Sequence, residues 1–252
     1  YLAGMAISIA IMAISIFTSE EARLVLWAAL VLGWIVGGTL LARSSDSFGT
    51  APTESMVERF GLFTIIVLGE VVVGVVDGLS EVERDIPTVA TGVLGLTIGF
   101  GFWWTYFDFA GARLPSPRGG QFAQWIYGHL PVTIAIAASG AAMVSLVEHA
   151  TDERAPAATA WLISGSAATL LVALVLVMRT LADYERLPRV YQPATVAMLA
   201  GAVVSLIIGW SRPAPWLLVL LLALIQSSIW FYGIDRWLRH GSAATAPIEL
   251  AD

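Results

Sequence analysis

The sequence is 252 residues long; 58% of them are hydrophobic, only 13% are charged, and the formal net charge is −6. A soluble domain is closer to half apolar and one quarter charged, so this composition excludes an ordinary soluble domain and indicates an integral membrane protein. The acidic balance argues against nucleic acid as a partner, and the absence of cysteine excludes disulfides and thiolate metal sites.

Long apolar runs are the main structural signal along the chain. A helix needs about 20 mostly apolar residues to cross the hydrocarbon core, and backbone groups in lipid must be paired internally. The sequence therefore predicts an all-α, polytopic helical membrane protein whose partner is the lipid bilayer. About eight transmembrane helices are expected, at residues 1–17, 23–43, 57–77, 86–107, 123–147, 157–180, 193–210 and 214–234.

Short polar stretches separate these runs, and no long soluble segment interrupts them. We expect residues 1–240 to form a single transmembrane bundle and residues 241–252 to form a disordered cytoplasmic tail. Arginine positions predict the orientation, because nine arginines fall on the loop side that includes the C-terminus and four on the other. By the positive-inside rule the expected location is the bacterial cytoplasmic (inner) membrane, with a cytoplasmic C-terminus.

The third apolar run contains a carboxylate far from either end. Glu70 lies 12 residues after Glu58, which is about 18 Å along a helix at 1.5 Å per residue. A charge inside the hydrocarbon costs roughly 2.5–3.5 kcal/mol on insertion scales. We therefore expect Glu70 to point into the bundle, toward a polar cavity or a hydrogen-bonding neighbour. A structural carboxyl, held by hydrogen bonds, is the alternative.

Four more candidates lie near the predicted cytoplasmic ends of three helices. Glu58 and Arg59 begin the third run, Asp108 ends the fourth, and His129 lies about one turn inside the fifth. With Glu70 they form a candidate substrate or ion pathway, or a buried polar cluster. The alternative is that charges at helix ends only snorkel or cap.

Neither a metal site nor a catalytic set is recognisable in the sequence. The chain has three histidines, without an HExxH pattern or a cluster of histidine and acidic ligands. We expect no metal and no cofactor, and we assign no catalytic residues. Enzyme activity therefore stays an open alternative rather than an expectation.

Three motifs together resemble the bacterial low temperature requirement protein A family. They are ERFGLFTIIVLGE from Glu58 to Glu70, WWTYFD from Trp103 to Asp108, and YGHLP from Tyr127 to Pro131. The resemblance implies a multi-pass bacterial membrane protein linked by name to growth in the cold, and it carries over no molecular activity. Family members have an earlier motif of the type W-x-E-L-F-F-D-L-x-F-V, so we expect the chain to be the later part of a longer protein.

Three functions are compatible with these observations. The leading hypothesis is transport or conduction of a small solute or ion, coupled to protons through Glu70. The second is a membrane-embedded enzyme that modifies lipid, with groups such as His129 as acid or base. The third is a non-catalytic membrane factor for growth in the cold. The sequence names neither the solute nor an oligomeric state.

Overall fold

The computed structural model describes residues 2–44 and 52–240, and all of its regular elements are helical. The predicted disordered tail at 241–252 lies outside the described residues. In chain order the elements are α1 (Leu2–Ser15), α2 (Glu20–Ser44), α3 (Glu54–Glu81), α4 (Ile86–Tyr106), η1 (Phe107–Gly111), α5 (Gly119–Glu148), α6 (Ala157–Met178), α7 (Pro188–Ser211) and α8 (Pro215–His240). The expected all-helical class is confirmed.

The number of membrane-crossing helices is smaller than the sequence suggested. Six helices of the described chain are long and apolar enough to cross a membrane: α3, α4 with η1, α5, α6, α7 and α8. The prediction of about eight spans is therefore too high. The shortfall is clearest at α1, whose 14 residues reach only about 21 Å, against roughly 30 Å of hydrocarbon.

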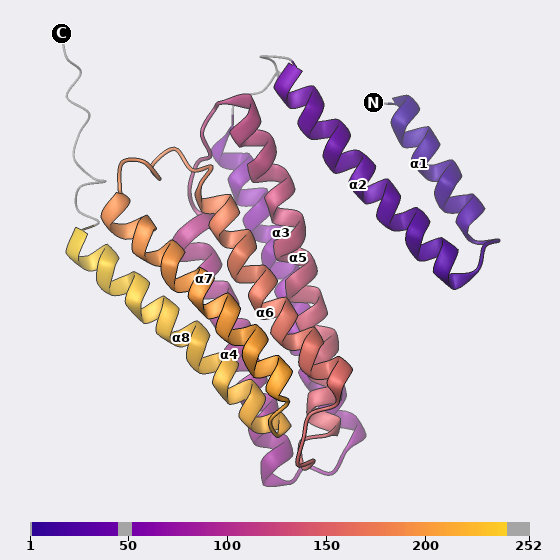
Figure 1. Cartoon of the computed structure of the whole chain (residues 1–252), viewed down its shortest axis with the longest axis vertical. Helices are drawn as coiled ribbons and strands as arrows, with labels where there is room; N and C mark the ends of the chain where they lie inside the picture. Colours follow the sequence, from indigo (N-terminus) through magenta and orange to yellow (C-terminus); the bar gives the residue numbers. More distant parts are fainter. Residues whose placement is uncertain (1, 45–51, 241–252) are drawn as a thin grey trace.

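The six candidate membrane-spanning helices pack as a flattened ring in the order α3, α5, α6, α7, α8 and α4. Helix α4 closes the ring by packing against both α8 and α3, and it also contacts α5 across the middle. The hairpin of α1 and α2 lies beside this ring, with α2 against α5 (Figure 1). Because chain neighbours α4 and α5 are not ring neighbours, the ring joins segments far apart in the sequence.

The bundle is apolar on its outer surface as well as in its core. Exposed apolar side chains occur along the spanning helices, such as Ile66 in α3, Val196 in α7 and Phe231 in α8. Helices that are apolar on all sides are typical of a membrane environment. The exposed surface therefore agrees with a protein that spans a bilayer.

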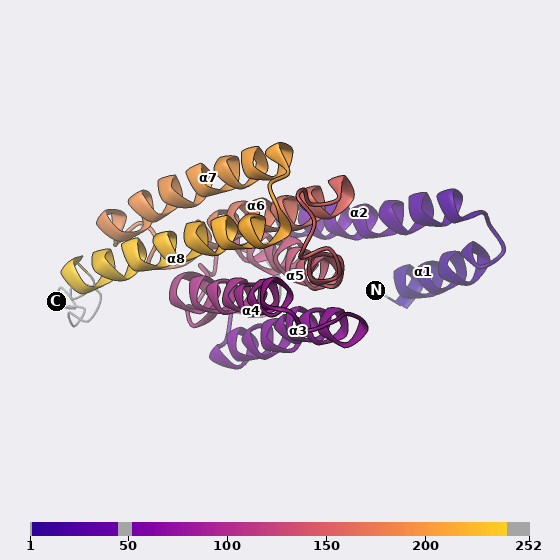
Figure 2. The same cartoon turned by 90° about the horizontal axis from the view of Figure 1, so that it is seen from below.

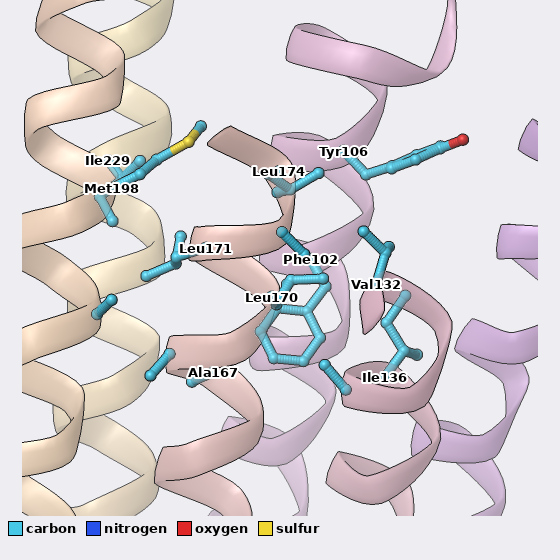
Figure 3. Packing of buried hydrophobic residues seen from close by; sticks show 14 of the residues in the cluster. Phe102, Tyr106, Val132, Ile136, Ala167, Leu170, Leu171, Leu174, Met198 and Ile229 are labelled. Atoms are coloured by element: carbon cyan, nitrogen blue, oxygen red, sulfur yellow. The ribbon is translucent and has the colours of Figure 1, made fainter. Parts of the chain in front are cut away.

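The core fills the middle of the ring with aliphatic and aromatic side chains. Phe102 of α4 lies against Leu170 of α6 and Ile136 of α5 in the close view of Figure 3. Tyr106, one turn further along α4, is fully buried, but its hydroxyl is directed away from the labelled apolar side chains (Figure 3). The hydroxyl therefore needs a polar partner elsewhere.

Short polar sequences set the helix ends. Thr53 caps α3 by accepting a hydrogen bond from the backbone N–H of Met56, and Asp85 caps α4 by accepting one from Thr88. Such caps satisfy N–H groups that have no partner within the helix. The helices thus extend a few residues past the apolar runs, as α3 does by beginning at Glu54.

Candidate functional site

One end of the bundle contains a groove that we call the α3 groove, with a volume of about 860 Å³. Its first wall is a stripe of α3 that includes Glu54, Glu58 and Ile65. The facing wall consists of η1 with the residues after it, from Phe107 to Leu114, and of the connection between α6 and α7, from Ala182 to Leu187. Three segments far apart in the sequence therefore form it.

Helix periodicity explains why one stripe of α3 faces the groove. Glu54, Glu58, Leu62 and Ile65 follow at spacings of four, four and three residues, which places them on one side of the helix. Glu54 and Glu58 occupy the end of the stripe, and Leu62 and Ile65 continue it toward the middle of the membrane. The wall therefore changes from charged to apolar along its length.

The second wall begins with a π-helical turn, η1, from Phe107 to Gly111. A π turn within an α-helix is rare and is often found at functional sites. The aromatic rings of Tyr106 and Phe107 lie so close to Gly111 that a Cβ there would collide with the Tyr106 ring, 2.5 Å away. Glycine thus lets the chain turn tightly around Tyr106 and directs Arg113 to the groove.

Arg113 is held by groups on three other segments. Its guanidinium forms an ion pair with Asp183, with an N–O distance of 2.8 Å, and donates to the backbone carbonyl of Asp108. It also lies 4.0 Å from the ring centroid of Trp237. Tyr191 donates a second hydrogen bond to Asp183, at 2.9 Å. These partners fix the wall and leave neither Arg113 nor Asp183 with an unbalanced charge.

The other charged groups of the groove have no such partners. Within residues 2–44 and 52–240, no ion pair or hydrogen bond joins the carboxylates of Glu54 and Glu58 or the guanidinium of Arg186 to another side chain. Two carboxylates on one wall therefore face one guanidinium on the other. These three groups are the ones available to a ligand.

Behind the groove lies a buried pair, Tyr106 and His129. The Tyr106 hydroxyl is 3.1 Å from Nε2 of His129, and Nδ1 of the same ring is 2.7 Å from the backbone carbonyl of Trp125. A carbonyl oxygen can only accept, so Nδ1 carries the proton, and in the neutral ring Nε2 accepts from Tyr106. Phe60 of α3 contacts the imidazole with a centroid distance of 4.7 Å.

The three motifs of the sequence analysis meet at this pair. ERFGLFTIIVLGE supplies Phe60, WWTYFD supplies Tyr106, and YGHLP supplies His129. A family model described as bacterial low temperature requirement A protein (LtrA) matches residues 1–225. The chain belongs to this family. No curated protein and no solved structure gave a match.

The LtrA-family chain distributes the five predicted site residues over several surroundings rather than one cluster. Glu58 lines the α3 groove, whereas the adjacent Arg59 is exposed and does not. Asp108 turns away from α3, because its carboxylate accepts a 2.6 Å hydrogen bond from Trp230 of α8. His129 is 2% exposed and is bound to Tyr106. Phe60 of α3 contacts the His129 ring, and among the described residues no ion pair or hydrogen bond joins Glu58 or Arg59 to Asp108 or His129.

Glu70 does not point into the bundle, and that expectation is wrong. It is exposed on the outer surface of α3, among side chains such as Ile66 and Val73 that are also exposed. The reason is the close crossing of α3 and α5: the backbone of Glu70 lies directly against Gly140, so its side chain emerges beside the crossing. Its functional role stays a prediction.

Sequence reasoning missed four members of the site: Glu54, Arg113, Asp183 and Arg186. Arg113 follows Asp108 by five residues in a polar loop, so its position at the membrane boundary could be predicted from the sequence. Nothing in the spacing links it to Asp183, which is 70 residues away. Only the arrangement of the helices brings the two together.

Proposed function

We propose that the protein transports a small solute or ion across the bacterial cytoplasmic membrane and that the α3 groove is its binding site. The observation that carries the proposal is the unpaired set of Glu54, Glu58 and Arg186 around a cavity of about 860 Å³. Small-molecule sites have volumes of roughly 300–1,000 Å³ and combine an apolar lining with a few polar groups. The groove meets both criteria.

A buried polar pair beside the groove supports transport over simple binding. Gly111 lines the groove and lies against the ring of Tyr106, whose hydroxyl is bonded to His129. In the proposed transport cycle, η1 moves and gives a bound solute access to these two buried polar groups. Polar groups inside a membrane bundle commonly mark the path of an ion or substrate.

Proton coupling through Glu70 is the second part of the proposal. Charging a carboxyl that faces hydrocarbon costs roughly 2.5–3.5 kcal/mol. A carboxylate at Glu70 therefore favours a state of the bundle in which it is hydrated or paired. Since Glu70 adjoins the crossing of α3 and α5, such a state changes the position of the helix that also walls the groove.

The positions of the arginines indicate the side of the membrane on which the groove opens. The groove includes Arg113 and Arg186 and lies at the end of the bundle that has nine of the thirteen basic residues. The positive-inside rule makes this end cytoplasmic, together with the C-terminus. A reporter fused after Leu238 should be active only in the cytoplasm; activity outside the cell would reverse the orientation.

Purified protein in liposomes tests the transport proposal. Uptake of labelled amino acids, polyamines and monovalent cations is measured together with the internal pH. We expect uptake of one solute class above that of empty liposomes, and we expect Glu58→Gln to lower it by roughly 10- to 100-fold, the value of one hydrogen bond to a charged group. Arg59→Gln is the matched control and should behave as the wild type.

The other outcomes of the same experiment identify the alternatives. Chemically altered lipids without uptake would replace transport with a lipid-modifying enzyme. The absence of both uptake and altered lipid would leave a non-catalytic membrane factor. Equal uptake by the wild type and Glu58→Gln would remove the groove from the transport route.

A further inference from the structure

The α3 groove has a polarity gradient that restricts what it can bind. Its charged end is marked by Glu54, and Ile65 lies 11 residues further along α3, about 16.5 Å at 1.5 Å per residue. Leu62 and Ile65 line the groove although they are 54% and 46% exposed. The inner half of the groove is therefore open to the apolar side of the helix. A solute that is polar throughout would leave this half unfilled.

The charges at the other end call for two opposite groups in one ligand. Glu54 and Glu58 are four residues apart on one helix face, where two like charges repel each other unless a cation lies between them. An ammonium group carries three donors and satisfies both carboxylates. Arg186 on the facing wall is suited to an anion, and a guanidinium binds phosphate with two parallel hydrogen bonds.

From this gradient and charge pattern we infer that the α3 groove binds a lipid whose headgroup joins an ammonium to a phosphate, as in phosphatidylethanolamine. The ammonium lies between Glu54 and Glu58, the phosphate meets Arg186, and an acyl chain follows Leu62 and Ile65. The inference goes beyond the proposed function: it gives the same groove a lipid ligand in addition to the transported solute, and it rests on that site but not on transport. A free zwitterion has the same headgroup chemistry without the chain.

Native mass spectrometry of the delipidated protein measures this directly. The probes are phosphatidylethanolamine, phosphatidylglycerol and phosphatidylcholine with identical acyl chains, and free phosphoethanolamine. We expect phosphatidylethanolamine to bind at least about tenfold more tightly than the other three, since one hydrogen bond to a charged group is worth about that much. Phosphatidylglycerol lacks the amine, phosphatidylcholine lacks N–H donors, and phosphoethanolamine lacks the chain.

Variants assign the selectivity to named groups. Glu54→Gln with Glu58→Gln should reduce the preference for phosphatidylethanolamine over phosphatidylglycerol to about onefold, whereas Arg186→Gln should weaken both lipids. Arg59→Gln, next to the groove and outside its lining, should change neither value. Glu58→Gln alone, compared by thermal unfolding, provides a second variant if the double one does not fold.

Two results would overturn the inference. Equal binding of all three lipids would show that the groove does not distinguish between their headgroups. Equal binding of phosphoethanolamine and the lipid, lost in Glu58→Gln, would make the ligand a free zwitterion. Flux is scored separately, so selective lipid binding without uptake keeps the inference and rejects transport.

Discussion

The two halves of helix α3 relate to their neighbours in opposite ways. In the half from Glu54 to Ile65 the helix touches η1 at Gly61, where a Cβ would lie 3.3 Å from the Phe107 ring, and the space left between α3, η1 and the α6–α7 connection is the α3 groove. In the half from Glu70 to Gly78 it is pressed against α5, with Gly74 touching Gly140 and Gly78 touching Val147. One helix thus provides both an open wall and a tight crossing.

The difference shows what places each carboxylate of α3. Glu58 faces a space bounded by side chains and loops, so its surroundings are polar and can hold a ligand. Glu70 adjoins a contact between two backbones, which leaves no room for a side chain between the helices. A glycine in each helix permits the contact, as small residues do in many membrane bundles. Close packing therefore excludes Glu70 from the interior.

The largest effect on stability is expected from Gly74→Ala, which disrupts the tight crossing of α3 and α5. A Cβ at Gly74 would collide with the carbonyl oxygen of Gly140, and backbone atoms cannot move aside as a flexible side chain can. Overpacking typically costs about 1–3 kcal/mol and sometimes more. We expect lower accumulation in the membrane and a clearly lower Tm. Gly69→Ala is the control, because a Cβ there has nothing within 4 Å; an equal loss in both would show that the crossing is not tight.

Glu70→Gln should abolish the coupling of proton movement to uptake and leave folding unchanged. Its side chain is exposed, so the variant should accumulate and melt like the wild type. It should bind the groove ligand normally, in contrast to Glu58→Gln, but lose proton movement linked to uptake, because glutamine keeps the shape and cannot titrate. Complementation of growth in the cold provides a second readout. Full activity of Glu70→Gln would end the coupling hypothesis, and failure to accumulate would favour a structural role.

Asp85, in the connection after the tight half of α3, should give the smallest effect. Hydrogen bonds from the side chain and backbone of Thr88 lower the pKa of Asp85 below its ordinary value of 3.8. The stabilisation by a group with a lowered pKa is present above the unfolded-state value and is lost as the pH falls through the folded one. Asp85→Asn also caps a helix but does not titrate.

The Tm of wild type and Asp85→Asn, measured at pH 6 and below pH 3.8, tests this cap. The two proteins should melt together at pH 6, and the wild type should lose slightly more on acidification. A larger acid loss in Asp85→Asn would contradict the assigned role. The same measurement on Gly74→Ala tells whether the tight half depends on the cap.

Part of the candidate site was open to prediction from the sequence. Glu58 and His129 were expected near one end of the bundle, because polar residues at the ends of long apolar runs fall at the membrane boundary. The three motifs that meet at Tyr106 were also recognisable. What could not be predicted was which of these residues share a contact, and in the structure Asp108 pairs with Trp230 instead of α3.

The sequence by itself determined the helices, their order and the membrane environment, since these depend on the length and composition of local segments. The tertiary structure alone decided which way Glu70 points and that Arg113 pairs with Asp183. The physical reason is that both sides of a membrane helix are apolar, so periodicity does not distinguish the lipid-facing side from the packed one. Backbone contact at Gly74 and Gly140 makes that distinction, and it exists only once α3 and α5 meet.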